Sequence, residues 1–136
     1  MTRVCDIESF LYDWAPRDLA MSWDNVGLLV GDGDAEVHKV LVALDVTEAV
    51  AAEAVAVGAD LIVAHHPLMN CVWHKVQHVT TCDAQGRTIT TLLKNGVSAI
   101  CMHTNLDAAE GGVNDVLAEK LGLHDTKHLT DEKIGR

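Results

Sequence analysis

The sequence predicts an α/β fold in which a parallel or mixed sheet is flanked by helices. A continuous apolar run, Leu61–Ala64, has the length and composition of a strand buried on both faces. An alanine-rich segment with strong helix propensity, residues 48–57, directly precedes this run. Because strands joined by helices pair in parallel through right-handed crossovers, the alternation indicates the α/β class.

The N-terminal segment predicts a helix and a further turn. Four apolar residues recur there at helical spacing: Val4, Ile7, Leu11 and Trp14. Asp6 is suited to the N-cap position, and Pro16 lies beyond the expected end. We therefore expect a helix over residues 6–14 and a turn over residues 18–21.

Two strands are expected before the alanine-rich helix. Flanking glycines delimit a short strand over residues 28–30. Apolar alternation that gives way to a buried run predicts a second strand over residues 37–45. Thr47 is a good N-cap for the helix over residues 48–57, and Gly58 is a natural stop.

The rest of the chain continues the alternation of helix and strand. A helix is expected over residues 88–94, a strand over residues 97–102 and a final helix over residues 113–121. Gly122 would end that final helix. Residues 68–85 are less regular.

Composition predicts a single globular α/β domain over residues 1–136. Apolar residues make up 49% of the chain, which is enough for a hydrophobic core and excludes a disordered protein. The formal charge is −10 without any Lys/Arg run, so we expect no nucleic-acid partner. With no membrane-length apolar stretch and no signal-peptide core, the expected location is the cytoplasm, where the four cysteines would stay thiols.

Polar side chains follow two of the expected strands at the point where each strand ends. His65 and His66 come directly after Leu61–Ala64, and His103 and Asp107 follow the strand over residues 97–102. In an open parallel sheet, ligands bind outside the carboxyl ends of the strands. Imidazole and carboxylate donors there suit a first-row transition metal.

Other roles for these residues remain open. Adjacent residues on a strand point to opposite faces, so both histidines reach one cluster only if the chain leaves strand geometry at Pro67, or if each binds a different ion. Otherwise they form a structural pair, one buried and one solvated. Asp107 can bridge two cations or simply cap a turn, and His103 can assist proton transfer or be an ordinary loop histidine.

Residues outside these strand ends are weaker candidates for a role at the metal site. Asp45 could orient a ligand histidine, although capping the following helix is the plainer role. Trp23 and Asp24 are expected to fix a packed turn, and Gly111 and Gly112 to form a turn before a helix.

A separate local pattern has donors spaced as C-x2-H-x3-H-x3-C. Its members are Cys71, His74, His78 and Cys82. Four such donors could hold a structural zinc ion, but a single short helix hardly brings them together tetrahedrally. Packed or solvated thiols and histidines are the favoured interpretation.

Four blocks of the sequence resemble the NIF-three-like family, named for an NGG-one-interacting factor. They are Trp23-Asp24-Asn25-Val26-Gly27-Leu28; Asp45-Val46-Thr47; Gly58-Ala59-Asp60-Leu61-Ile62 with His65-His66-Pro67-Leu68; and His103-Thr104-Asn105-Leu106-Asp107 with Gly112-Val113-Asn114-Asp115. They occur in the family's order and together cover most of the chain. Such a set is highly specific for this family.

The resemblance implies a dinuclear, metal-dependent hydrolase of the GTP cyclohydrolase I type 2 kind, acting on a purine nucleotide. It implies His65, His66 and Asp107 as metal ligands and places His103 beside them as the residue that assists proton transfer. The expected cofactors are two divalent ions per complete site, drawn from zinc, iron, manganese, nickel or cobalt. The resemblance also implies a homo-oligomer, specifically a ring-shaped hexamer.

The chain departs from the family pattern in one respect. The family's remaining ligands, a histidine and a glutamate, come from a second half of the sequence, whereas this chain resembles only the N-terminal half. The chain is therefore expected to be a fragment or a truncated relative with an incomplete site. The alternative to an enzyme is a non-catalytic metal-binding or oligomeric interaction module.

Overall fold

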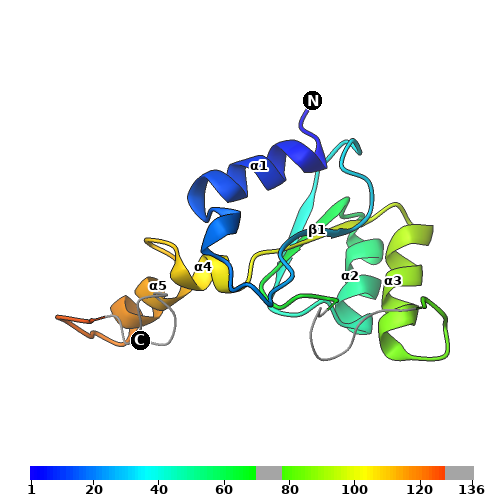
Figure 1. The fold of residues 1–136 in the computed structure, drawn as a ribbon. Helices are drawn as coiled ribbons and strands as arrows, with labels where there is room; N and C mark the ends of the chain where they lie inside the picture. Colours follow the sequence, from blue (N-terminus) through cyan, green and yellow to red (C-terminus); the bar gives the residue numbers. More distant parts are fainter. Residues whose placement is uncertain (70–77, 128–136) are drawn as a thin grey trace.

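The computed structural model describes residues 1–69 and 78–127, and the sheet lies at the centre of this part of the chain (Figure 1). The elements in chain order are α1 (Val4–Trp14), the 3-10 helix η1 (Arg17–Leu19), β1 (Gly27–Val30), β2 (Val40–Ala43), α2 (Glu48–Val57), β3 (Leu61–Ala64), α3 (Ala84–Lys94), β4 (Ser98–Cys101), α4 (Thr104–Ala108) and α5 (Val113–Lys120). The α/β class predicted from the sequence is confirmed.

The four strands form one mixed sheet in the order β1-β4-β3-β2. β2, β3 and β4 are parallel, as expected for strands that helices connect, with α2 between the first two and α3 between the last two. β1 pairs with β4 in antiparallel orientation. No helix separates β1 from β2 along the chain, so the crossover argument does not apply to β1.

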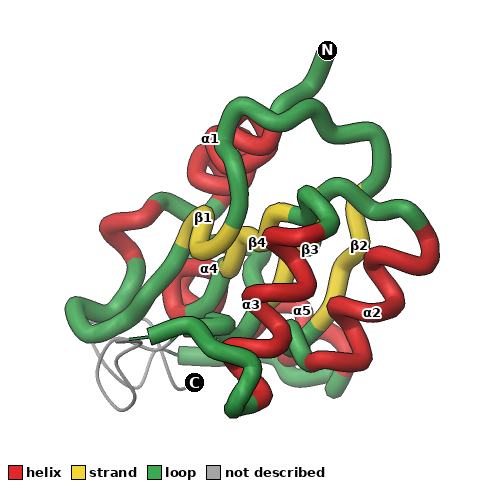
Figure 2. The backbone as a smooth tube through the Cα atoms, turned by 90° about the vertical axis from the view of Figure 1, so that its right-hand side faces the viewer, coloured by secondary structure: helices red, strands yellow, loops and turns green. Residues whose placement is uncertain are grey.

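The sheet has helices on both faces (Figure 2), and alternation along β3 explains the two cores. Ile62 packs in a buried cluster with Ala51 of α2 and Leu92 of α3. Its neighbour Leu61 points to the opposite face, in a second cluster with Val4 of α1. Because β3 contributes to both clusters, it is apolar throughout, as the sequence indicated.

Element boundaries differ from the predictions at helix starts and at both ends of β2, which spans Val40–Ala43 within the predicted 37–45. α1 begins at Val4 and not at Asp6, because Asp6 accepts a hydrogen bond from the Arg3 backbone and so lies inside the first turn. α3 begins at Ala84, since the Asp83 side chain caps it through Gly86 N–H at 2.7 Å. The predictions for α2, with Thr47 as N-cap and Gly58 as left-handed C-cap, are confirmed.

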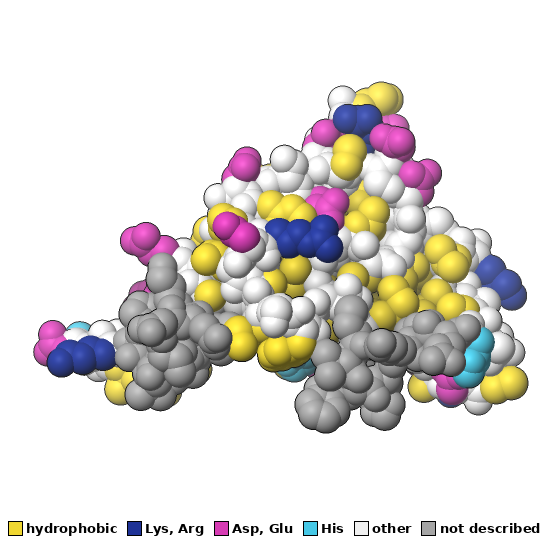
Figure 3. All heavy atoms as spheres, in the orientation of Figure 1, with side chains coloured by type: hydrophobic (Ala, Val, Ile, Leu, Met, Phe, Trp, Pro, Cys, Tyr) yellow, Lys and Arg dark blue, Asp and Glu magenta, His cyan; other side chains and the backbone are white. Residues whose placement is uncertain are grey.

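The surface carries scattered charge and a helix that stands apart. α5 extends away from the layer of α2 and α3 and has no buried residue. On the face shown in Figure 3, the Lys and Arg side chains of the described residues lie apart and form no continuous patch. None of the helices in residues 1–69 and 78–127 has the length and apolar character that crossing a bilayer requires.

Two glycines provide a matched test of backbone strain. Gly31 has φ +110°, and a Cβ there would lie 2.2 Å from Ser98 Oγ and 2.7 Å from Ser98 Cα, whereas Gly58 has φ +65° and open space around it. Gly58→Ala should lower the free energy of unfolding by about 1 kcal/mol, the cost of a left-handed residue. Gly31→Ala should cost at least about 2 kcal/mol more, because strain and overlap with Ser98 add. Urea unfolding of both variants checks this, and equal losses would contradict it.

Candidate metal centre

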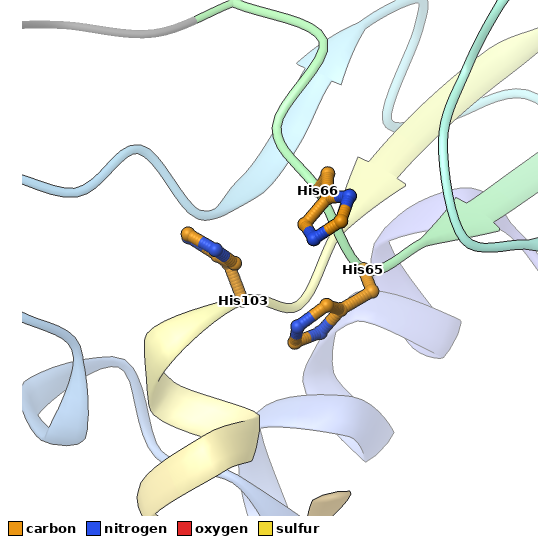
Figure 4. A group of neighbouring side chains, drawn as sticks. All are labelled: His65, His66 and His103. Carbon is orange, nitrogen blue, oxygen red and sulfur yellow. The ribbon is translucent and has the colours of Figure 1, made fainter. Parts of the chain in front are cut away.

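The ends of β3 and β4 lie side by side at the carboxyl edge of the sheet. The two strands are parallel neighbours, and their last residues, Ala64 and Cys101, are paired. The chain then continues to His65 and His66 from β3 and to His103 from β4. Figure 4 shows the three imidazoles facing a common space in front of these strand ends.

The three imidazoles are close enough to share a cation. Ring centroids lie 5.0 Å apart for His65 and His66, 5.1 Å for His65 and His103, and 5.7 Å for His66 and His103. One ring nitrogen from each residue lies within 4.8 Å of the other two. This group therefore has the spacing of a metal-binding cluster.

The adjacent histidines reach the same cluster because the chain leaves the strand ladder after Ala64. The backbone N–H groups of His65 and His66 both donate to the carbonyl of Leu44, at 3.2 and 2.9 Å. Two successive amides cannot share one acceptor in a regular strand, where they point in opposite directions. The structure thus favours the first of the alternatives left open by the sequence.

Acceptors outside the cluster hold the histidines of the β3 end. His65 Nδ1 lies 2.9 Å from the Met102 carbonyl oxygen, and His66 Nδ1 lies 2.7 Å from Asp45 Oδ1. Since a carbonyl and a carboxylate only accept, both Nδ1 atoms carry a hydrogen, and in the neutral form of each ring Nε2 keeps the lone pair. Histidine ligands of metals are oriented in this way.

Asp45 and Cys101 each form a hydrogen bond with a histidine of the cluster. The side chain of Thr47 caps α2 by accepting a hydrogen bond from Val50 N–H. Asp45 instead contacts His66, and this contact is the one that an orienting role for Asp45 requires. Burial raises the pKa of the Cys101 thiol, which is thus protonated and donates to the His65 carbonyl at 2.9 Å.

Asp107 joins the cluster from α4, a short helix that the sequence analysis missed. Its Oδ1 lies 3.6 Å from His65 Nε2, and both side chains are mostly buried. Asp107 lies one turn into α4, so the helix turns the carboxylate back toward the strand ends. The four residues singled out from the sequence are thus brought to one edge of the sheet.

Asp24 is a neighbour of the cluster whose part was not recognised in the sequence. Both of its carboxylate oxygens lie 3.0 Å from His103 Nδ1, and its side chain is 1% exposed. The turn expected at Trp23 and Asp24 is therefore also in contact with the candidate centre, with the Trp23 ring 6.4 Å from that of His103. The available signal was its position in the block Trp23-Asp24-Asn25-Val26-Gly27-Leu28, shortly before an expected strand.

The hydrogen bonds of Asp24 determine its charge. Burial alone would raise its pKa, but donors on Thr104, His103 and Asn25 together hold the pKa below its usual value. Asp24 is therefore an ionised carboxylate in the folded protein at neutral pH.

A hollow of about 480 Å³ adjoins the cluster on the side of His66. Its wall includes Asp45 and Thr47 at the start of α2 and Ala84 and Gln85 at the start of α3. The exposed His66–Asp45 pair thus borders an open space, whereas His65 and His103 lie deeper.

The local zinc pattern falls largely outside the described residues. Cys71 and His74 lie in the range 70–77, which the structure does not describe, so the pattern stays untested. Of the other two members, Cys82 is an exposed free thiol and His78 Nε2 lies 3.9 Å from Asp83 Oδ2.

Fold and site together define an α/β protein with a histidine-rich cluster, able to hold a metal ion, at the carboxyl edge of a mixed sheet. The family Duf34/NIF3 (NGG1p interacting factor 3) matches residues 2–136. The chain belongs to this family, as the four sequence blocks predicted.

Curated relatives carry one recurring name. A Listeria innocua protein named "GTP cyclohydrolase 1 type 2 homolog" is 47% identical over 117 residues, which cover 86% of this chain and 31% of the relative. A Clostridium perfringens protein of the same name is 44% identical over 119 residues, covering 88% of this chain and 44% of the relative.

Solved structures share the fold. A Bacillus cereus protein related to NIF3 superposes with a TM-score of 0.86 at 42% identity, covering 95% of this chain and 35% of that one. Reduced HcgD from Methanocaldococcus jannaschii gives a TM-score of 0.86 at 35% identity, covering 96% of this chain and 51% of that one. The chain thus spans about a third to a half of the proteins that it matches.

The depressed pKa of Asp24 predicts how acid affects the metal-free protein. An unfolded aspartate has a pKa of about 3.9, so the stability that the folded carboxylate contributes is complete above about pH 5. It is lost as the pH falls below about 4, through the lower folded pKa. Asp24→Asn should therefore be less stable than wild type at pH 7, and the difference should shrink toward pH 3. Urea unfolding across this range measures it, and a pH-independent difference would exclude Asp24 as a source of acid sensitivity.

Proposed function

We propose that this chain forms the metal-binding part of a protein related to dinuclear, metal-dependent hydrolases. His65, His66 and Asp107 are the proposed ligands, and His103 is the proposed proton-transfer residue. The observation that carries the proposal is the cluster itself, with three ring nitrogens within 4.8 Å of one another and a carboxylate 3.6 Å from one of them.

The donor set fits divalent first-row metals. Neutral imidazoles whose Nδ1–H is already engaged, together with a carboxylate, suit zinc, iron, manganese, nickel or cobalt, and availability in the cell selects among them. A pair of such ions would be held by His65, His66 and Asp107 at this one cluster. When bound, these ions supply a Lewis acid that makes hydroxide available near neutral pH.

The proposed substrate is a purine nucleotide such as GTP. Support comes from the names of the relatives, and the hollow beside His66 offers a place for a small molecule next to the cluster. In this proposal His103 accepts and returns a proton, because it lies beside both ligand histidines and is largely shielded from water.

The competing proposal is a non-catalytic metal-binding or interaction module. The chain spans 31% of one curated relative and 44% of another, so activity and substrate of those whole proteins do not transfer automatically. In this second proposal the cluster holds metal but turns over no nucleotide.

Metal binding is tested by removing single ligands. His65→Ala and His66→Ala should each weaken zinc binding more than about tenfold, because each removes a nitrogen whose orientation is already fixed. His38→Ala is the matched control, since His38 is an exposed histidine paired with Glu36 and Asp60. Equilibrium dialysis of the wild type and the variants against zinc and manganese gives affinity and stoichiometry. Wild-type affinity in a His65→Ala/His66→Ala double variant would refute the site.

Turnover separates the two proposals. The wild-type chain, loaded with each of the five metals in turn, is incubated with GTP, and ring opening is followed by absorbance and mass. The hydrolase proposal expects a product that is lost in His66→Ala and His103→Ala but kept in His38→Ala. Bound metal without product in all five cases would favour the interaction module.

Self-association is a further part of the proposal. The family resemblance predicts a homo-oligomer, with a hexamer as the expected form. Light scattering on the purified chain measures the mass directly, and a monomer at all concentrations would contradict this part for the chain as given.

A further inference from the structure

Asp24 lies among donors of fixed orientation. The backbone N–H of Asn25 donates to Oδ1 at 2.8 Å, and the backbone N–H of Thr104 donates to Oδ2 at 3.0 Å. The Thr104 hydroxyl accepts from Met21 N–H at 2.9 Å, which leaves its own hydrogen for Oδ2 of Asp24. Within residues 1–69 and 78–127, the hydrogen-bond partners of this carboxylate other than His103 are thus all donors.

The remaining partner is the imidazole of His103. Its Nδ1 lies 3.0 Å from both oxygens of Asp24, although the two residues are 79 positions apart in the chain. An ionised carboxylate only accepts, and this one is almost fully shielded from water. A hydrogen on Nδ1 satisfies this contact, whereas a bare Nδ1 would place two lone pairs against each other.

We infer that Asp24 is a positioning residue that fixes His103 as the Nδ1–H tautomer and leaves an unprotonated Nε2 for the cluster. The equivalent contact of Asp45 with His66 fixes the tautomer of its imidazole less firmly, because those side chains are 46% and 51% exposed and water competes for both. The side chains of His103 and Asp24 are 19% and 1% exposed. The imidazole of His103 is therefore more firmly fixed than that of His66.

This tautomer determines what His103 can do, and that consequence rests on the proposed function. When Nε2 takes a proton from a water molecule at the cluster, the water O–H bond breaks, an Nε2–H bond forms and hydroxide remains. The resulting imidazolium lies against the negative charge of Asp24, which stabilises it. Donation of the Nε2 lone pair to a cation needs the same tautomer, so Asp24 serves either use.

The test is ring-nitrogen NMR of the metal-free chain at about pH 8.5, roughly two units above the usual histidine pKa. His103→Gln assigns the signals. The Nδ1–H form of His103 should exceed the Nε2–H form by at least about tenfold, a ratio that corresponds to about 1.4 kcal/mol. A nuclear Overhauser contact between this Nδ1–H and the Thr104 amide hydrogen is also expected. A predominant Nε2–H form, or no such contact, would overturn the inference.

Asp24→Asn tests the cause. The amide oxygen should stay with the two donors of Thr104, because turning it away would set an NH₂ group against both. The NH₂ then replaces Oδ1, next to Asn25 N–H and His103 Nδ1, so Nδ1–H loses one of its two acceptors and faces a neutral group in place of a charged one. The tautomer ratio should therefore fall by about tenfold. Asp45→Asn is the matched control and should leave the His103 ratio unchanged. An unaltered ratio in folded Asp24→Asn would overturn the inference.

The outcome is independent of whether the chain binds metal. The NMR samples contain no metal, so failure of the proposed function shows in the dialysis experiment and failure of this inference in the tautomer ratio.

Discussion

The structure depends on the parallel pairing of β3 with β4. Their register places Ala64 opposite Cys101, so both strands end at the same level. His65 and His66 follow β3 directly and His103 follows β4, so the three imidazoles lie close together. A shift of the register by one residue would exchange the two faces of β4 and move His103 away from the cluster. The pairing that forms the apolar core thus also determines the geometry of the candidate centre.

Hydrogen-bond acceptors near the strand ends orient the imidazoles that the strand register brings together. The Met102 carbonyl and the carboxylates of Asp45 and Asp24 lie against one nitrogen of each imidazole. These acceptors belong to the protein, so the rings are oriented before any ligand arrives. Preorganisation of this kind strengthens binding, because less conformational freedom is lost when the ligand enters.

The sequence predicted those parts of the structure that local signals determine. β3 was predicted to the residue because it is apolar on both faces, and α2 because Thr47 and Gly58 define its ends. The strand β1 was predicted, but its antiparallel pairing with β4 was not, because that pairing is a long-range contact. The short α4 was also not predicted, since it is a single stabilised turn.

In the candidate site, too, some residues could be predicted from local sequence signals and others could not. The strand-end histidines and Asp107 could be found by their position along the chain. The contact of Asp24 with His103 spans 79 residues, and no periodicity or spacing reports such a pair. The sequence predicted a packed turn at Asp24, but its partner His103 is found only when β1 and β4 are paired.

Exposure differs across the cluster, and this difference bears on how the proposed function would operate. The His66–Asp45 pair borders the hollow of about 480 Å³, whereas the His103–Asp24 pair lies on the protected side. Of the three histidines, the lining of this hollow includes His66 alone, so a small molecule in it would contact His66. The protected side also has the lower effective dielectric, where a carboxylate stabilises an imidazolium more strongly than it does in water. A proton acceptor is most effective where its charged form is stabilised and bulk water is excluded, and His103 occupies that side of the cluster.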